Sequence, residues 1–213
     1  MAKQTYFILG TDTGIGKTWV TAELMRAYKM KGLSVLGVKP MASGQSWIDG
    51  ELINEDVAIL REQSTENVPI EWINPFVFSK PIAPHIAAEE EGLRVDVEQL
   101  SAALQAALSH EVDLCFLEGC GGVLCPINES QSMLDLNVAL NIPIILVVGM
   151  RLGCLNHALL SVNAIEQRGL RLVGWIANIL DPKMPYLDKN IATLEQQINA
   201  KRLFIDEAQL IDV

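Results

Sequence analysis

The sequence predicts an α/β fold with a mostly parallel, twisted sheet and helices on both faces. Short apolar stretches alternate with stretches whose apolar residues recur at helical spacing, which is typical of parallel strands joined by crossover helices. Residues 144–148 are apolar at every position, as expected of a strand buried on both faces. Neither a repeat nor a linker-like stretch divides the 213 residues. We therefore expect one domain over residues 1–213, with ligands at the carboxyl ends of its strands.

Turn residues and apolar spacing place the elements along the chain. The expected strands cover residues 5–10, 34–39, 113–117, 142–148 and 172–180. The expected helices cover residues 17–31, 54–62, 96–110, 134–140, 155–168 and 185–200. Gly32 and Gly169 follow two of these helices and act as stop signals. Residues 64–84 combine prolines with aromatic residues, so we interpret them as an irregular excursion.

Composition and charge exclude several classes of protein. The chain is 50% hydrophobic and 20% charged, which supports a packed core and excludes disorder. Its net charge of −10 disfavours nucleic acid and anionic membranes as partners. The apolar stretches are far shorter than the ~20 residues of a membrane helix, and the one near the N-terminus is too short for a signal peptide. We expect a cytoplasmic protein.

The cysteines are Cys115, Cys120, Cys125 and Cys154. In a cytoplasmic chain of this size we do not expect disulfides. Zinc and iron–sulfur motifs usually contain a close Cys-x-x-Cys pair, which this sequence lacks, so we do not expect the thiols to bind metal. We interpret the four as small apolar residues in a strand and in loops.

A phosphate-binding loop follows the first strand. Residues 10–18 read Gly-Thr-Asp-Thr-Gly-Ile-Gly-Lys-Thr and lead into a helix, an order typical of a P-loop NTPase fold. Glycines let the backbone wrap an anion, and the helix N-terminus adds a favourable dipole. Lys17 is expected on the β- and γ-phosphates, and the Thr18 hydroxyl on Mg²⁺. The groups expected around the phosphates are Gly14, Ile15, Gly16, Lys17 and Thr18.

The loop also differs from its commonest form. Thr11 occupies the position where the standard P-loop has its first glycine, and Gly10 lies one residue earlier. Asp12 stands where partitioning-type ATPases carry an extra lysine, which argues against a switch ATPase of that kind.

Three more charged residues are candidates for the site: two end expected strands and one begins an expected helix. Glu118 ends one strand and precedes a Gly-Cys-Gly-Gly loop, so it is a candidate Mg²⁺ ligand, with a solvated strand-end acid as the alternative. Asp56 lies at a helix start, where an acid is also favoured by the dipole alone. Lys39 ends the second strand and would bring an ammonium near the phosphates, unless it simply closes the strand.

Five motifs in order resemble the ATP-dependent dethiobiotin synthetases over nearly the whole chain. They are Gly-Thr-Asp-Thr-x-x-Gly-Lys-Thr, Val-Lys-Pro-Met-Ala-Ser-Gly, Glu-Gly-x-Gly-Gly, Leu-Gly-Cys-Leu-Asn-His-Ala and Gly-Trp-Ile-Ala-Asn. The resemblance implies a ligase that uses ATP, Mg²⁺ and CO₂ to convert 7,8-diaminononanoate to dethiobiotin in biotin synthesis. The implied intermediates are a carbamate and its mixed anhydride with phosphate.

The resemblance also implies roles for individual residues. Thr18, Asp56 and Glu118 become metal ligands, and Lys39 and Lys17 become catalytic lysines. Thr13 and Ser43 are expected on the diamine or carbamate. The further nucleotide contacts are expected from Gly119, Cys120, Gly121 and, on the adenine, Asn178.

A homodimer is implied as well, with the substrate near the subunit interface. The substrate carboxylate is expected at a helix N-terminus of the second subunit, formed here by Gly153, Cys154 and Asn156. Asn156 can also be read simply as a residue of the helix cap.

This chain departs from the family pattern at three places. Gly14 stands where some members carry glutamate, and Cys120 replaces the usual alanine. Many members continue with a Gly-x-x-Pro segment that lines the adenine pocket, but no glycine or proline follows Pro185 here. Residues 203–205 are expected to supply a strand and some base contact instead. We therefore expect a preference for ATP over GTP or CTP below about 100-fold, or about 2.7 kcal/mol.

Three other functions share parts of this pattern. The main alternative is a P-loop switch ATPase that acts through a protein partner. A small-molecule kinase would use the same loop without releasing phosphate, and a nucleotide-binding module would not catalyse at all. Phosphate release that depends on the diamine distinguishes the four.

Overall fold

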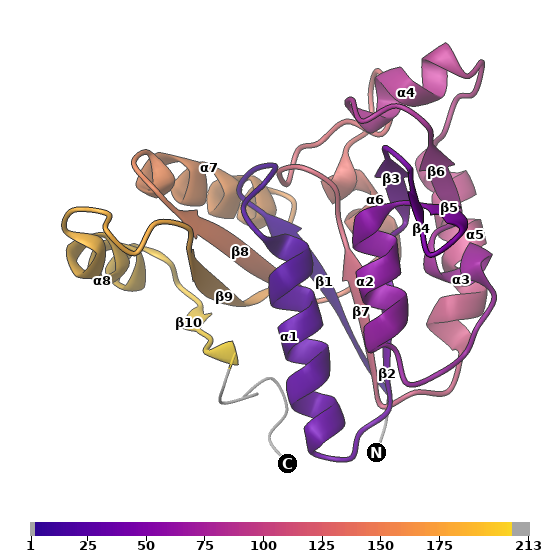
Figure 1. Ribbon diagram of the computed structural model, residues 1–213. Helices are drawn as coiled ribbons and strands as arrows, with labels where there is room; N and C mark the ends of the chain where they lie inside the picture. The colour runs from indigo at the N-terminus through magenta and orange to yellow at the C-terminus, as the bar shows by residue number, and fades with distance from the viewer. Residues whose placement is uncertain (1–2, 206–213) are drawn as a thin grey trace.

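A six-stranded parallel sheet forms the centre of the computed structural model, which describes residues 3–205. Its order is β10-β9-β8-β1-β7-β2, and every neighbouring pair is parallel (Figure 1). The strands are β1 (Gln4–Gly10), β2 (Val35–Val38), β7 (Leu114–Glu118), β8 (Ile144–Met150), β9 (Leu172–Ile179) and β10 (Lys201–Arg202). The α/β fold class is confirmed. The single domain over residues 1–213 stays a prediction, and residues 1–2 and 206–213 lie outside the described residues.

Helices cover both faces of the sheet (Figure 1). The helices of residues 3–205 are α1 (Lys17–Met30), α2 (Glu55–Gln63), α3 (Ile70–Ile73), α4 (Pro84–Glu90), α5 (Val97–Ser109), α6 (Met133–Leu140), α7 (Cys154–Gln167) and α8 (Leu187–Gln197). Alternate residues of β1 point to opposite faces: Ile8 packs in the cluster that contains Leu24 of α1, while Leu9 packs in the one that contains Leu104 of α5. None of the helices among residues 3–205 is long and apolar enough to cross a membrane.

Local side chains set several of the helix starts. The Asn54 side chain accepts hydrogen bonds from the first turn of α2. Asp96 and Gln99 form a capping box at α5, and Ser132 and Asp135 form another at α6. The start of α8 lies two residues later than expected because Tyr186 adopts a left-handed conformation (φ 56°) that a helix cannot include.

The excursion after β2 contains short elements that the sequence analysis did not resolve. They are β3 (Met41–Ser43), β4 (Ser46–Ile48), β5 (Glu51–Ile53) and β6 (Phe76–Phe78). β3 pairs with β6 in parallel, and β4 with β5 as an antiparallel hairpin. The helix α4 lies beside the short strands β3 and β6 rather than on the central sheet (Figure 1). The segment 64–84 is therefore not wholly irregular: it holds α3, β6 and the start of α4.

The last expected strand, at residues 203–205, is wrong. The observed strand β10 pairs Lys201 with Gly174 and Arg202 with Trp175. The Leu203 amide still donates to the Trp175 carbonyl (2.8 Å). Pairing ends there, and the Leu203 side chain is buried against Gly174.

The outer edge of β2 is hydrogen-bonded by the chain that leaves α2. Val35 donates its amide to Thr65 Oγ1 (2.9 Å), and the Thr65 amide donates to the Val35 carbonyl (2.9 Å). The Gly37 amide donates to Ser64 Oγ (3.1 Å). Residues 64 and 65 therefore take the place of a further strand.

Candidate active site

A cavity of about 740 Å³ opens at the carboxyl ends of β1, β7 and β2. It is lined by the loop after β1, the loop after β7, the start of α2 and the segment that leads into α4. Residues expected at the site that line it are Thr13, Gly14, Gly16, Lys17, Thr18, Lys39, Ser43, Asp56, Glu118, Cys120 and Gly121. The sheet edge thus brings together residues that lie far apart along the chain, from Thr13 to Gly121.

The phosphate loop is shaped by two glycines in left-handed conformations. Gly14 has φ 69° and Gly16 has φ 81°, a region that L side chains rarely adopt. Gly16 caps α1 without a side-chain hydrogen bond, so the amides of the first turn remain available to an anion. The Asn178 side-chain amide donates to the Ile15 carbonyl (2.6 Å) and lies so close to Gly16 that a methyl group there would overlap it.

Lys17 lies over this loop and is buried, with 7% exposure. Its Nζ donates to the Asp12 carbonyl (2.8 Å) and to the Gly121 carbonyl (2.6 Å). Burial is the main cause that lowers the pKa of Lys17, and repulsion from Lys39 lowers it further. A bound polyphosphate would supply the negative charge that this ammonium needs.

Lys39 bridges the two carboxylates that the sequence analysis singled out. Its Nζ lies 2.6 Å from Glu118 Oε1 and 2.7 Å from Asp56 Oδ2. Burial by itself would lower the pKa of Lys39, but Glu118 and then Asp56 outweigh it and raise the pKa. Burial opposes the ionisation of Asp56, but the charge of Lys39 holds its pKa below the usual value. The lysine is therefore a fixed cation at the cavity floor.

The neighbouring oxygens fit a magnesium ion. The Thr18 hydroxyl donates to Glu118 Oε1 (2.7 Å), and Glu118 Oε2 is buried without a hydrogen-bond partner. A hydroxyl and one or two carboxylates, completed by phosphate oxygens and water, form the set that Mg²⁺ usually takes. Within residues 3–205 no group of three or more His, Cys, Asp or Glu side chains is placed to hold a metal alone, so the phosphates would have to complete the coordination.

Asn54 is a site residue that the sequence analysis missed. Its Oδ1 accepts from the amides of Asp56 (3.1 Å) and Val57 (3.3 Å), which fixes the start of α2. Its Nδ2 donates to the carbonyls of Ser43 (3.2 Å) and Gly44 (2.7 Å). One side chain thus connects the backbone at Asp56 to the end of β3. An asparagine before a helical stretch was the available signal.

The opposite wall of the cavity was also missed. Residues 81–84 line it, and Ser43 Oγ donates to the Ile82 carbonyl (2.6 Å). Two prolines, Pro81 and Pro84, flank this turn, and Pro84 opens α4 as proline often does at a helix start. The further missed lining residues are Ala42 and Cys125.

The remaining expected residues lie outside the cavity lining. Gly153 (φ 95°) caps α7 without a side-chain hydrogen bond, with Cys154 and Asn156 in its first turn. An ion pair between Arg151 and Asp12 connects this end of α7 to the phosphate loop. Ile15 packs in the core, and Gly119 lies against Leu9 at the end of β1.

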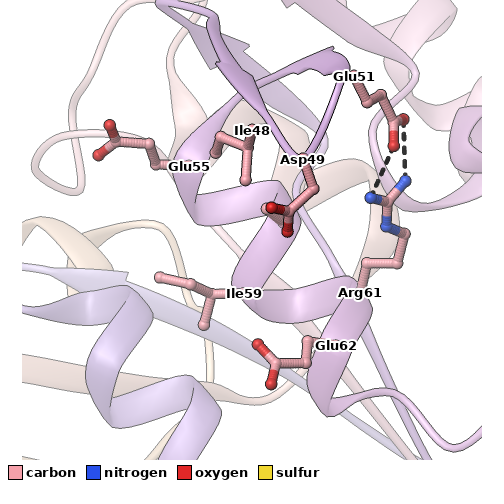
Figure 2. Close-up of a pocket in the computed structure, with 8 residues that line it drawn as sticks. Ile48, Asp49, Glu51, Glu55, Ile59, Arg61 and Glu62 are labelled. Carbon is pink, nitrogen blue, oxygen red and sulfur yellow. Dashed lines mark hydrogen bonds and ion pairs between the residues drawn. The ribbon is translucent and has the colours of Figure 1, made fainter.

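A second groove of about 600 Å³ lies between the β4–β5 hairpin and α2 (Figure 2). It is lined mainly by acidic and apolar side chains, and Glu51 forms an ion pair with Arg61 there (2.8 Å; Figure 2). It contains no residue of the phosphate loop or of the loop after β7. The chemistry is therefore assigned to the cavity at the sheet edge.

The four cysteines are free thiols, as expected. Cys115 is buried in β7, and burial raises its pKa to about 12. Cys120 packs in the hydrophobic core and Cys125 packs against it, and both also line the cavity. Their Sγ atoms lie 3.4 Å apart.

The parallel sheet, the glycine-rich loop and its buried lysine define a P-loop nucleotide-binding protein. Residues 4–205 match a family described as an AAA domain. The fold is similar to a ParA family ATPase from Chlorobium tepidum (TM-score 0.56, 16% identity, 98% of this chain and 87% of that one). It is also similar to the MinD cell division protein of Aquifex aeolicus (TM-score 0.52, 13% identity, 93% and 79%).

Curated relatives narrow this class. Proteins named ATP-dependent dethiobiotin synthetase BioD from Aromatoleum aromaticum and Cellvibrio japonicus are each 46% identical over 200 residues, or 94% of this chain. The match covers 88% and 87% of their lengths. A third, from Nitrosospira multiformis, is 41% identical over 203 residues, 94% of this chain and 86% of the relative. The chain belongs to the ATP-dependent dethiobiotin synthetase family.

Proposed function

We propose that this cavity performs the ATP- and Mg²⁺-dependent carboxylation of 7,8-diaminononanoate by CO₂ and closes the ring of dethiobiotin, with ADP and phosphate as products. The observation that carries the proposal is the meeting of Lys17, Lys39 and Glu118 beside the phosphate loop in one cavity. Family membership supports the same ligase reaction.

Three bonds are made in turn. One amine of the substrate attacks CO₂ and loses a proton to give a carbamate. A carbamate oxygen then attacks the γ-phosphorus of ATP, and the bond to the leaving ADP breaks. The second amine attacks the carbonyl carbon of this mixed anhydride and expels phosphate, which closes the cyclic urea.

The difficult encounter is between two anions, the carbamate and the γ-phosphate. The ammonium groups of Lys17 and Lys39 reduce their repulsion and stabilise the charge that spreads in the transition state. Both lysines are held by neighbours, Lys17 by two carbonyls and Lys39 by two carboxylates, so little reorganisation is needed when the substrates bind. Burial of both groups strengthens these interactions.

Thr18, Asp56 and Glu118 would hold the magnesium ion. When bound, the ion would neutralise phosphate charge and polarise the phosphoryl oxygens around the phosphorus under attack. The unpartnered Oε2 of Glu118 supports this assignment.

The other contacts extend the proposal around the cavity. Thr13 and Ser43 line the cavity and would contact the diamine or carbamate. The loop with Gly119, Cys120 and Gly121 would lie along the phosphates. Asn178 would contact the adenine through the side-chain oxygen that its bond to Ile15 leaves available. The chain would act as a cytoplasmic homodimer, with Gly153, Cys154 and Asn156 of a second copy at the substrate carboxylate.

Phosphate release by the purified protein tests the proposal. MgATP and bicarbonate are supplied with and without 7,8-diaminononanoate, and the product is identified by mass. We expect release only with the diamine, together with the cyclic urea. Release without the diamine would favour the switch ATPase, and ADP formed without free phosphate would favour a kinase.

A further inference from the structure

Two thiols face each other inside the cavity. Cys120 follows β7 and Cys125 lies five residues later, and their Sγ atoms are 3.4 Å apart. Cys120 is buried at the cavity wall, whereas Cys125 is partly exposed to the cavity, so a small molecule in the cavity can reach it. A disulfide requires an S–S distance of roughly 2.0 Å, so the two atoms need to approach by about 1.4 Å.

The backbone holds this pair in place on both sides. The Cys125 amide donates to the Gly122 carbonyl (2.9 Å), which closes a turn that points Cys125 back at Cys120. The Met133 amide donates to the Cys125 carbonyl (3.0 Å) and fixes the turn to the start of α6. On the other side, the Gly119 amide donates to the Ile8 carbonyl (3.0 Å) and anchors the chain just before Cys120.

The other two cysteines lack this arrangement. Cys115 lies fully buried in β7, and Cys154 is 3% exposed at the start of α7. The hydrogen bond from Cys120 is the main cause that lowers the pKa of Cys125, burial opposes it, and the charges of Lys17 and Lys39 lower the pKa further. Cys125 is thus the thiol of the four that is both reachable and placed among cations.

We propose that Cys120 and Cys125 form a modification site, a dithiol that a low-molecular-weight disulfide oxidises to an intramolecular disulfide. The Cys125 thiolate attacks one sulfur of the small disulfide, whose S–S bond breaks and releases one thiolate. Cys120 gives its proton to the departing thiolate and its sulfur attacks the Cys125 sulfur, which expels the second thiolate. Two protein thiols lose two electrons and two protons, and the small disulfide becomes two thiols.

The disulfide acts on the phosphate-binding lysine through Gly121. The Gly121 carbonyl accepts from Lys17 Nζ (2.6 Å), and the space beside its Cα is already filled by Cys125 Sγ, 3.1 Å from where a Cβ would lie. Drawing the two sulfurs together therefore displaces Gly121 and one of the two partners of Lys17. Turnover should fall about tenfold or more in the oxidised protein. This consequence, unlike the disulfide itself, rests on the proposed function.

Intact mass and peptide mapping test the disulfide without reference to activity. The full-length protein is equilibrated in glutathione buffers of rising oxidised fraction, and free thiols are then alkylated. We expect a mass lower by two hydrogen atoms before alkylation, and a Cys120–Cys125 cross-link after digestion. A lasting glutathione adduct on Cys125, a bond that involves Cys115 or Cys154, or thiols that stay reduced would each overturn the proposal.

Variants test the assignment and its effect. Cys120→Ala and Cys125→Ser should each abolish the cross-link, while Cys115→Ala, which alters the buried thiol of β7, should retain it. Each variant's turnover is compared before and after oxidation, with folding checked by thermal melting. The ratio of turnover before oxidation to turnover after it should be at least ten for wild type and for Cys115→Ala, reversed by dithiothreitol, and near one for Cys125→Ser. Cys120→Ala lacks the resolving thiol and should stop at a glutathione adduct on Cys125, which intact mass detects. A cross-link that leaves wild-type turnover unchanged would overturn the role of Gly121, and a reduced protein inactive with the diamine would overturn only the proposed function.

Discussion

The two halves of the sheet's carboxyl edge differ in how many of the expected site residues the single chain brings into contact. At β1, β7 and β2, the expected lysines, carboxylates and hydroxyls meet in one cavity and bond to one another. At β8 and β9, Asn178 packs on the phosphate loop, while Gly153 and Asn156 lie exposed at the start of α7. The neighbouring Leu152 is 95% exposed.

This difference reflects two kinds of recognition. Phosphate transfer needs fixed charges in a place with little water, so its groups must be buried and paired within the fold. A carboxylate can be held by amides at an open helix N-terminus, which needs no buried side chains. The proposed second copy would complete the second half.

Removing Lys39 should have the largest effect. Lys39→Met leaves the fully buried Glu118 without its partner, so we expect turnover to fall about 10³-fold and the free energy of unfolding to drop by about 3 kcal/mol. Lys80→Met is the matched control, because its ion pair with Glu90 is exposed and should contribute under about 0.5 kcal/mol. Steady-state kinetics and urea unfolding measure both. Equal effects in the two variants would contradict the assigned role.

Alanine substitutions at Gly16 and Gly32 distinguish the effect of backbone strain from the effect of steric overlap. Both glycines have φ near 80°, but a methyl group at Gly16 would overlap the Asn178 amide, whereas nothing lies within 4 Å of one at Gly32. We expect Gly32→Ala to cost about 1 kcal/mol of stability without altering nucleotide affinity. Gly16→Ala should cost more and weaken ATP binding about 100-fold. Calorimetric titration with MgATP measures the affinities, and similar affinities would show that the loop tolerates the methyl group.

The start of α7 should affect only the diamine. Asn156→Ala is expected to raise KM for the diamine about tenfold, roughly the 1.4 kcal/mol of one good hydrogen bond, with KM for ATP unchanged. Asn163→Ala, at an exposed position on the same helix, serves as the control. If both KM values rise in Asn156→Ala, the two halves of the edge are not separate.

The amino edge of the sheet should have the smallest effect, a loss of stability at neutral pH that disappears in acid. The Ser34 amide and hydroxyl both donate to Asp113 (2.8 Å each) and hold its pKa below the usual value. The stability from this pair is present above the unfolded pKa of about 3.9 and is lost as the pH falls through the lower folded value. Asp113→Asn should therefore flatten the fall of unfolding free energy below pH 4, and activity should not change. The exposed Glu111→Gln is the control; an equal change there would remove the link to Ser34.

The sequence predicted the long elements and the residues that directly follow strands. Lys39 and Glu118 were identified because the carboxyl ends of parallel strands meet at one edge. The strand pairs β3–β6 and β4–β5 were not predicted, because three residues are too few to show the alternation of apolar and polar side chains that marks a strand. The cavity wall at residues 81–84 depends on a contact with Ser43, some forty residues away. The approach of Cys120 to Cys125 depends on the turn that the Gly122 carbonyl closes. Such contacts leave no local pattern.

The covering of the β2 edge by residues 64 and 65 has a consequence for the fate of the chain in a crowded cell. A bare strand edge offers a template on which strands of other chains can add, and aggregates grow in that way. Here the amides of Val35 and Gly37 are already satisfied by Thr65 and Ser64 of the same chain. In the folded chain a strand of another protein therefore finds neither of these amides free to pair with.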